Sequence, residues 1–184
     1  MLQTVLEHRK SSCVSITGMR AVENFQASDL WNSAILLVED DDVDIELLRR
    51  AFRGARIANP LIEVKDGRVA LEYLSGDGAY ADRARYPIPF LILLDLRLPR
   101  LSGFEVLEWI RDQPDLADLI VVVLTTSDHV PDATKAHKLG ANSYLVKPGN
   151  FSELVEMVKG IKGRWLVLES VPEDAASTEA TRPA

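Results

Sequence analysis

An acidic run directly after an apolar one is the first place where this sequence suggests chemistry. The apolar stretch 35–38 is followed by a cluster of carboxylates: Glu39, Asp40, Asp41, Asp42 and Asp44. Carboxylates crowded at the end of a buried element repel one another, and their burial is costly unless a positive group joins them. The run therefore predicts a site that includes a positive partner.

Polar side chains of other kinds follow three more apolar runs. Asp95 follows the run 90–94, Thr125 follows a run that ends at 124, and Lys147 follows a short run near the end of the pattern. Each residue alone is weak evidence, because an aspartate after a strand is more often a helix cap and a lysine is usually a solvated surface residue. The carboxyl ends of parallel strands share one edge of a sheet, so all of them together favour a single site.

The elements that would position these residues alternate along the chain. Short apolar runs bounded by polar or turn residues predict buried strands at 34–38, 61–64, 90–94, 119–124 and 143–146. Amphipathic patterns between them predict helices, with inward faces such as Ile45, Leu48, Ala51 and Phe52, or Val69, Leu71 and Leu74. Five alternations predict an α/β fold, a doubly wound five-stranded parallel sheet with helices on both faces.

Composition limits the class of protein and its domain organisation. The 184 residues are enough for one domain, and we expect a weakly ordered arm at 1–32, a folded domain at 33–169 and a disordered tail at 170–184. A net charge of −7 disfavours direct binding to nucleic acid. The only cysteine is Cys13, no apolar run is long enough to span a bilayer, and the first residues lack a signal-peptide core. A cytoplasmic protein is expected.

Four motifs resemble those of response-regulator receiver domains, the phosphoacceptor half of two-component signalling: "LLVEDD", "LLDLRLPRLSGFE", "VVVLTTS" and "GANSYLVKP". The resemblance covers about Ala34 to Ile161 and implies a flavodoxin-like (βα)₅ fold with strand order 2-1-3-4-5. The stretch 58–99 and the ending "RWLVLESVP" resemble single-domain regulators that serve phytochrome kinases.

The resemblance implies that Asp95 is a nucleophile that accepts a phosphoryl group from a phosphohistidine. It also identifies the positive partner of the acidic run as a divalent metal, Mg²⁺, which favours oxygen ligands. Asp40 and Asp95 would ligate the metal directly, Glu39 partly through water, and Arg97 through its backbone carbonyl.

Other family roles fall on residues near the last two strands. Lys147 and the Thr125 hydroxyl would each bind a phosphoryl oxygen. Tyr144 matches the family's aromatic switch, although a half-buried strand tyrosine is an equally good interpretation. Pro148 matches the family's cis-proline, which would direct the lysine inward.

The implied function is that of a single-domain response regulator that signals by protein contact and catalyses only its own phosphotransfer and dephosphorylation. Its partner would be a histidine kinase, with phytochrome-linked kinases first among the candidates, or a phosphotransfer protein. No room is expected for a DNA-binding output domain. The apolar residues Trp165 to Leu168 would either cover the domain's own core or form a homodimer contact.

Some residues leave alternatives open. Arg97 and Ser127 stand two residues after Asp95 and Thr125, where a long side chain could cover the path of the hydrolytic water, so the lifetime of the phosphoryl group stays open. A phosphatase of the haloacid-dehalogenase type would need an aspartate at position 97, which argues against it. A receiver-like module that is never phosphorylated would lack one of the key residues, and none is missing.

The remaining acids of the run have a simpler interpretation. Asp41, Asp42 and Asp44 stand where the first turn of a helix is expected, and negative charge there suits the helix dipole. We therefore expect them to stabilise the helix and not to bind the metal.

Overall fold

Five short apolar segments pair into one parallel sheet in the computed structural model, which describes residues 34–165 of the chain. The strand order is β2-β1-β3-β4-β5, which confirms the predicted fold. The strands are β1 (Ile35–Val38), β2 (Leu61–Val64), β3 (Leu91–Leu94), β4 (Ile120–Thr125) and β5 (Ser143–Val146).

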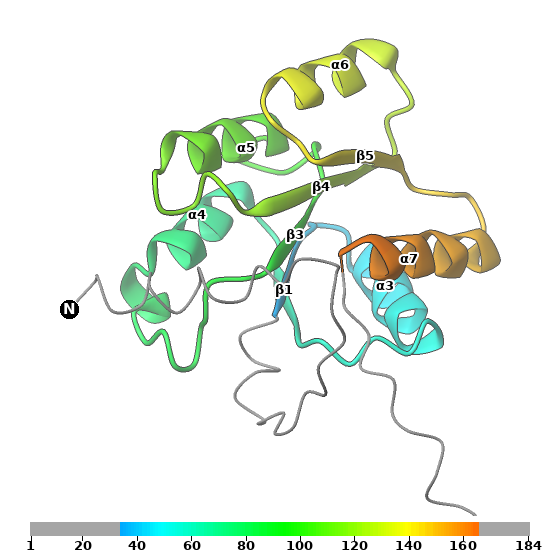
Figure 1. Cartoon of the computed structure of the whole chain (residues 1–184), viewed down its shortest axis with the longest axis horizontal. Coiled ribbons are helices and arrows are strands. Elements are labelled where there is room, and N and C mark those ends of the chain that lie inside the picture. Colours follow the sequence, from blue (N-terminus) through cyan, green and yellow to red (C-terminus); the bar gives the residue numbers. More distant parts are fainter. Residues whose placement is uncertain (1–33, 166–184) are drawn as a thin grey trace, which may run out of the picture.

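Helices cover both faces of the sheet (Figure 1). On one face lie α3 (Asp42–Gly54) and α7 (Phe151–Trp165). On the other lie α4 (Gly67–Ser75), α5 (Gly103–Asp112) and α6 (Val130–Lys138), and a short 3₁₀ turn η1 (Gly78–Tyr80) follows α4. Each strand is followed by a helix, as the alternating pattern predicts, and the helices after β1, β2, β3 and β4 form the crossovers to the next strand.

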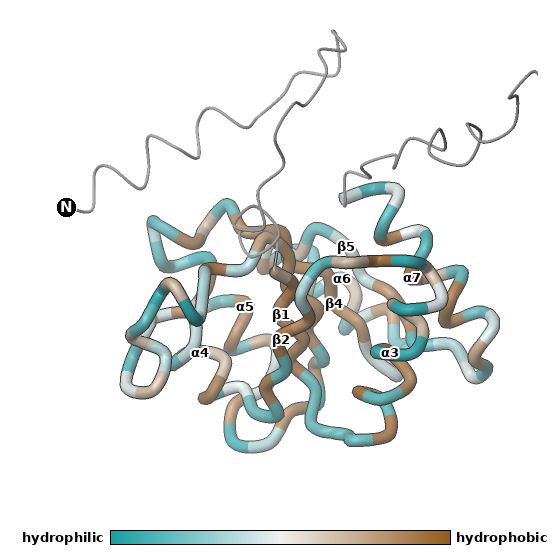
Figure 2. The backbone as a smooth tube through the Cα atoms, turned by 90° about the horizontal axis from the view of Figure 1, so that it is seen from below, coloured by the Kyte–Doolittle hydropathy of each residue, from teal (hydrophilic) through white to brown (hydrophobic). Residues whose placement is uncertain are grey.

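The core consists of two layers, one on each side of the sheet. Ile35 and Leu37 of β1 pack towards α3 and α7, whereas Leu36 and Val38 pack towards α4, α5 and α6. This alternation follows from the period of two in a strand. Figure 2 shows the hydrophobic strands between the two helical layers. Burial of both faces explains why the strands are continuous apolar runs instead of alternating ones.

The three helices that follow β1, β2 and β3 each begin with a side-chain cap. Asp41 accepts hydrogen bonds from the first-turn amides of α3, and Asp66 does the same for α4. Ser102 and Glu105 form a reciprocal capping box at the start of α5. These caps satisfy amides that have no partner within a helix, so they determine where each helix begins.

The inward face of α4 differs from the prediction. The structure buries Ala70, Tyr73 and Leu74, while Val69 and Leu71 are only half-buried. Tyr73 can be buried because its hydroxyl donates a 2.7 Å hydrogen bond to the backbone carbonyl of Pro87. A search for apolar residues at helical spacing does not predict the burial of Tyr73, because that burial depends on a hydrogen-bond partner 14 residues further along the chain.

A tyrosine cluster organises the long connection between α4 and β3. The rings of Tyr73, Tyr80 and Tyr86 meet edge to face, with centroids 5.1 to 6.2 Å apart. Arg83 donates hydrogen bonds to the carbonyls of Tyr73, Leu74 and Tyr86, and so satisfies groups at the end of α4. The connection is therefore an ordered layer over α4.

Several predictions concern parts of the chain outside the described residues. The expected arm at 1–32, the tail at 170–184 and the apolar segment 166–168 are among them, whereas Trp165 is the last residue of α7. Among the helices that the structure describes, none is long and apolar enough to cross a membrane.

Candidate functional site

The pairing register of the sheet brings the ends of β1 and β3 together. Val38 pairs with Leu94, and the amide of Asp95 donates a 3.0 Å hydrogen bond to the carbonyl of Val38. Glu39 and Asp95 therefore leave neighbouring strands at the same level. Both are buried, with 2% and 6% of their surface exposed.

The ammonium group of Lys147, at the end of β5, joins these two carboxylates. Its Nζ lies 2.5 Å from Glu39 Oε2, 2.9 Å from Asp95 Oδ2 and 2.7 Å from Asp44 Oδ2. Burial alone would lower the pKa of Lys147, but the hydrogen bonds to Asp44, Glu39 and Asp95 outweigh burial and raise it above the usual value. Lys147 is therefore a positive partner of the acidic run.

Glu39 is the carboxylate most affected by its surroundings. Burial raises its pKa to about 7, because removal from water disfavours the charged form. The hydrogen bond and charge of Lys147 act in the opposite direction, and the nearby charge of Asp95 adds to the increase. A second cation at this edge would stabilise the ionised form of Glu39.

The end of β4 is tied to β5 through backbone and hydroxyl contacts. Thr125 is fully buried, its carbonyl accepts a 2.7 Å hydrogen bond from the amide of Lys147, and its hydroxyl accepts one from the amide of Ser127. The hydroxyl of Tyr144 donates to the carbonyl of Ser127, and the Ser127 hydroxyl donates to Asp132 at 2.6 Å. Displacement of Thr125 would therefore act on Tyr144 as well.

The backbone after Asp95 is held close to the start of α5. The amide of Gly103 donates a 3.1 Å hydrogen bond to the carbonyl of Leu96, and a Cβ at position 103 would lie 2.1 Å from the carbonyl oxygen of Asp95. Only glycine allows this approach without displacement of the backbone. The amide of Arg97 also donates to Asp95 Oδ1 at 3.1 Å, so the carboxylate has a defined orientation.

The structure brings together most of the residues predicted from the sequence to form this site. Glu39, Asp95 and Lys147 are in direct contact, and Thr125 ends the adjacent strand. Asp40 follows Glu39 but is exposed to solvent, as is Arg97.

One expectation about this edge is wrong. No cis peptide bond occurs in the described residues, so the bond between Lys147 and Pro148 is trans and not cis. The trans form is favoured by about 0.5–1 kcal/mol for such bonds. Three carboxylates attract the ammonium group, and the hydrogen bond of its own amide to Thr125 continues the pairing with β4. Lys147 therefore points inward without a cis bond.

Asp44 contacts Lys147 at this edge, which its position in the sequence did not lead us to expect. It was expected only to suit the helix dipole, but its carboxylate contacts Lys147. A signal was available, because Asp44 stands four residues before Leu48 and seven before Ala51, both of which are buried. Residues at this spacing share one face of a helix, so Asp44 belongs to the inward side of α3.

The donor set suits a hard cation. Glu39, Asp40 and Asp95 offer only oxygen atoms, and with Asp44 they carry more negative charge than Lys147 can neutralise. Within residues 34–165 no three acidic, histidine or cysteine side chains are grouped closely enough to form a ready-made metal cluster. Lys147 Nζ lies among the carboxylates and bonds to oxygens of Glu39 and Asp95. A cation would have to share these oxygens with the lysine.

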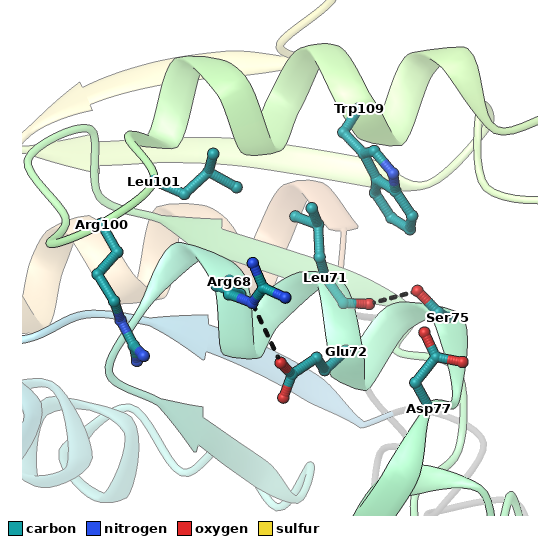
Figure 3. Close-up of a pocket in the computed structure, with 8 residues that line it drawn as sticks. All are labelled: Arg68, Leu71, Glu72, Ser75, Asp77, Arg100, Leu101 and Trp109. Carbon is teal, nitrogen blue, oxygen red and sulfur yellow. Dashed lines mark hydrogen bonds and ion pairs between the residues drawn. The ribbon is translucent and has the colours of Figure 1, made fainter.

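A separate hollow of about 470 Å³ lies between α4 and α5 (Figure 3). Its lining residues are Arg68, Leu71, Glu72, Ser75, Asp77, Arg100, Leu101 and Trp109. Several polar groups in it already have protein partners, since Arg68 pairs with Glu72, Arg100 with Asp66, and the Ser75 hydroxyl with the carbonyl of Leu71. The hollow therefore has no evident part in the chemistry at the strand ends.

Comparisons with known proteins agree with this geometry. The model of the response regulator receiver domain family matches residues 35–159. The response regulator Rcp1 of Synechocystis sp. is 41% identical over 138 residues, which cover 75% of this chain and 92% of Rcp1.

Solved structures of two such regulators are also similar. The phosphorylated cyanobacterial phytochrome response regulator RcpA is 39% identical with a TM-score of 0.69, and the match covers 76% of this chain and 98% of RcpA. The Mn²⁺-bound form of Rcp1 is 41% identical with a TM-score of 0.67, and the match covers 76% and 99% of the two chains.

Proposed function

The chain belongs to the response regulator receiver domain family of two-component systems, and from this premise we propose that Asp95 is its phosphoacceptor. The observation that carries the proposal is the contact of one ammonium group, on Lys147, with the buried carboxylates of Glu39 and Asp95. A nucleophilic carboxylate beside a fixed positive charge suits transfer of a group that carries negative charge. We further propose that the chain acts as a single-domain regulator, as the coverage of Rcp1 supports.

In the proposed reaction, a carboxylate oxygen of Asp95 attacks the phosphorus of a phosphohistidine on a partner kinase. The new P–O bond forms an acyl phosphate, the P–N bond breaks, and the imidazole nitrogen keeps the electron pair. Negative charge on the equatorial oxygens must be neutralised while this happens, so catalysis is mainly positioning and electrostatic stabilisation.

Three side chains and one carbonyl would hold the divalent cation, proposed to be Mg²⁺: Glu39, Asp40, Asp95 and the backbone carbonyl of Arg97. The oxygen-only donor set and its excess negative charge support this assignment. When bound, the cation supplies positive charge for one phosphoryl oxygen.

Lys147 and Thr125 would bind the other phosphoryl oxygens. Lys147 already contacts Asp95. Thr125 is the last residue of the neighbouring strand β4, and its side chain is buried. A movement of Thr125 towards the phosphoryl group would act on Tyr144 through the carbonyl of Ser127. We propose that Tyr144 reports the phosphorylated state at the surface formed by α6 and β5.

The proposed partner is a histidine kinase linked to a phytochrome, or a phosphotransfer protein. The similarity to the phytochrome response regulator RcpA supports the choice of kinase. We propose that output passes through protein contact, including contact between two copies of this chain, in the cytoplasm. The protein would act as a phosphoacceptor in signalling and catalyse only its own phosphotransfer and dephosphorylation.

Labelling with a small phosphodonor tests the acceptor assignment. The protein is incubated with acetyl phosphate and Mg²⁺, and mass spectrometry measures and locates the adduct. We expect one phosphoryl group on the wild type and on the control Asp77→Asn, an exposed aspartate at the start of η1. Asp95→Asn should show none, and undiminished labelling of that variant would overturn the assignment.

A further inference from the structure

Asp44 is the third carboxylate that contacts the ammonium group of Lys147, and it belongs to a helix instead of following a strand. Its Oδ2 lies 2.7 Å from Nζ, closer than Asp95 Oδ2 at 2.9 Å. Glu39 and Asp95 follow the ends of β1 and β3, whereas Asp44 lies in the first turn of α3. The packing of α3 against the sheet therefore adds a partner for the lysine that the strand ends do not supply.

The three contacts use the full donor capacity of the lysine. An ammonium group has three N–H donors. Lys147 directs them to Glu39, Asp44 and Asp95. A phosphoryl oxygen on Asp95 can therefore bind Lys147 only if one of these three acceptors, Asp95 Oδ2 included, gives up its hydrogen bond.

Phosphorylation removes the carboxylate charge of Asp95 itself, so exposure decides which of the two carboxylates that stay charged, Glu39 and Asp44, is released at the lower cost. The side chain of Asp44 is 31% exposed, compared with 2% for Glu39 and 7% for Asp95. A buried carboxylate that loses its partner bears the full cost of desolvation, whereas a partly exposed one is hydrated by water. Asp44 is therefore the partner that can leave most easily.

We propose that Asp44 is a positioning residue that holds Lys147 in the unphosphorylated protein and is displaced by the incoming phosphoryl group. The inference rests on the proposed function of Asp95. Asp44 disfavours the phosphorylated state in two ways: it competes for the ammonium group, and its negative charge repels the phosphoryl group nearby. Loss of its charge should therefore strengthen binding of a phosphoryl group.

Asp42 provides a matched control within the same turn of helix. Both Asp42 and Asp44 are in the first turn of α3, so both interact with the dipole of that helix. Asp42 pairs with Lys65 and its side chain is 79% exposed, so it does not share the contact with Lys147. A difference between Asp42→Asn and Asp44→Asn therefore reports the lysine contact and not the helix.

The experiment measures the affinity for beryllofluoride, a phosphoryl mimic, by ¹⁹F NMR of the bound fluorine signal. Wild type, Asp44→Asn and Asp42→Asn are compared at saturating Mg²⁺, because the charge of Asp44 also attracts the cation. We expect Asp44→Asn to bind the mimic at least about threefold more tightly, the size of effect typical of a partly exposed ion pair. Asp42→Asn should stay within about twofold of the wild type, as an exposed pair contributes little.

The outcomes separate this inference from the proposed function. Equal or weaker binding by Asp44→Asn, while the wild type binds the mimic, would overturn the inference alone. A merely structural role would weaken binding and lower the melting temperature, which is the opposite sign for binding. Absence of binding to the wild type at saturating Mg²⁺ would overturn the proposed function together with this inference.

Discussion

The hydroxyl of Tyr144 donates a 2.9 Å hydrogen bond to the backbone carbonyl of Ser127, two residues beyond Thr125. The bond connects β5 to the loop that follows β4. A second connection joins the same elements, because the amide of Lys147 donates to the carbonyl of Thr125. The residues proposed to bind the phosphoryl group, Thr125 and Lys147, are thus linked by hydrogen bonds to Tyr144.

Loss of Lys147 should uncouple phosphorylation from association. In the proposed mechanism, the ammonium group of Lys147 changes its partner from the Asp95 carboxylate to a phosphoryl oxygen. Neither alanine nor arginine places the same compact charge at this position. In light scattering with Mg²⁺, we expect beryllofluoride to change the mass of the wild type in the presence of its partner, or alone if it self-associates, but not that of Lys147→Ala. Lys159→Ala is the control, since Lys159 is half exposed and its ion-pair partner within residues 34–165 is Glu156. An equal shift in Lys147→Ala would show that another residue carries the coupling.

Asp40 and Asp42 should differ in their effect on Mg²⁺. Asp40 directly follows the strand end, whereas Asp42 lies in α3 and pairs with Lys65. Mutation of residues that only support metal ligands typically changes metal affinity by about 10–100-fold. Removal of Asp40, which we propose as a direct ligand, should therefore weaken Mg²⁺ binding by at least about tenfold. Calorimetric titration of Asp40→Ala and Asp42→Ala with Mg²⁺ measures this difference. An equal loss of Mg²⁺ affinity in both variants would contradict the assignment of Asp40 to the metal and of Asp42 to the helix.

Gly103→Ala should disturb the site through the backbone of Asp95. The added Cβ would lie 2.1 Å from the carbonyl oxygen of Asp95 and 2.8 Å from Leu96 Cα, so the chain must move. Urea unfolding should show a loss of about 1–3 kcal/mol, typical of overpacking, together with slower phosphorylation.

Gly160→Ala is the control for this substitution. Within residues 34–165, a Cβ at position 160 in α7 meets no atom within 4 Å apart from its chain neighbours and the backbone of its own helix. Alanine has the higher helix propensity, so this variant should gain up to about 1 kcal/mol and be phosphorylated normally. A neutral result for Gly103→Ala would mean that the backbone near Asp95 adapts.

Tyr73 should make the protein sensitive to alkaline pH. Burial raises the pKa of its hydroxyl from 10.0 to about 12. Between these values the folded state binds more protons than the unfolded state, so the stability contributed by Tyr73 is present below pH 10 and is lost as pH rises to about 12.

Tyr73→Phe isolates this contribution. At pH 7 the variant should be less stable by about 1–3 kcal/mol, because the buried carbonyl of Pro87 loses its partner. Chemical unfolding at several pH values should show this difference shrinking above pH 10. A difference that stays constant up to pH 12 would contradict the assigned role.

The sequence by itself determined the elements and the edge where chemistry is expected. Continuous apolar runs such as 35–38 and 91–94 can be stable only when both faces of a strand are buried, which requires helices on both sides of the sheet. Glu39, Asp95 and Lys147 were identified because the end of a strand is a local feature that the sequence displays directly.

Tertiary structure alone decided which partner each charged group finds. Lys147 and Asp44 are 103 residues apart in the chain, and only the packing of α3 against the sheet brings them within 2.7 Å. The burial of Tyr73 depends in the same way on the carbonyl of Pro87. The trans bond before Pro148 is compatible with an inward lysine because the carboxylates that attract it come from other elements. Sequence patterns report local preferences, whereas these contacts depend on free energies of groups that meet only after folding.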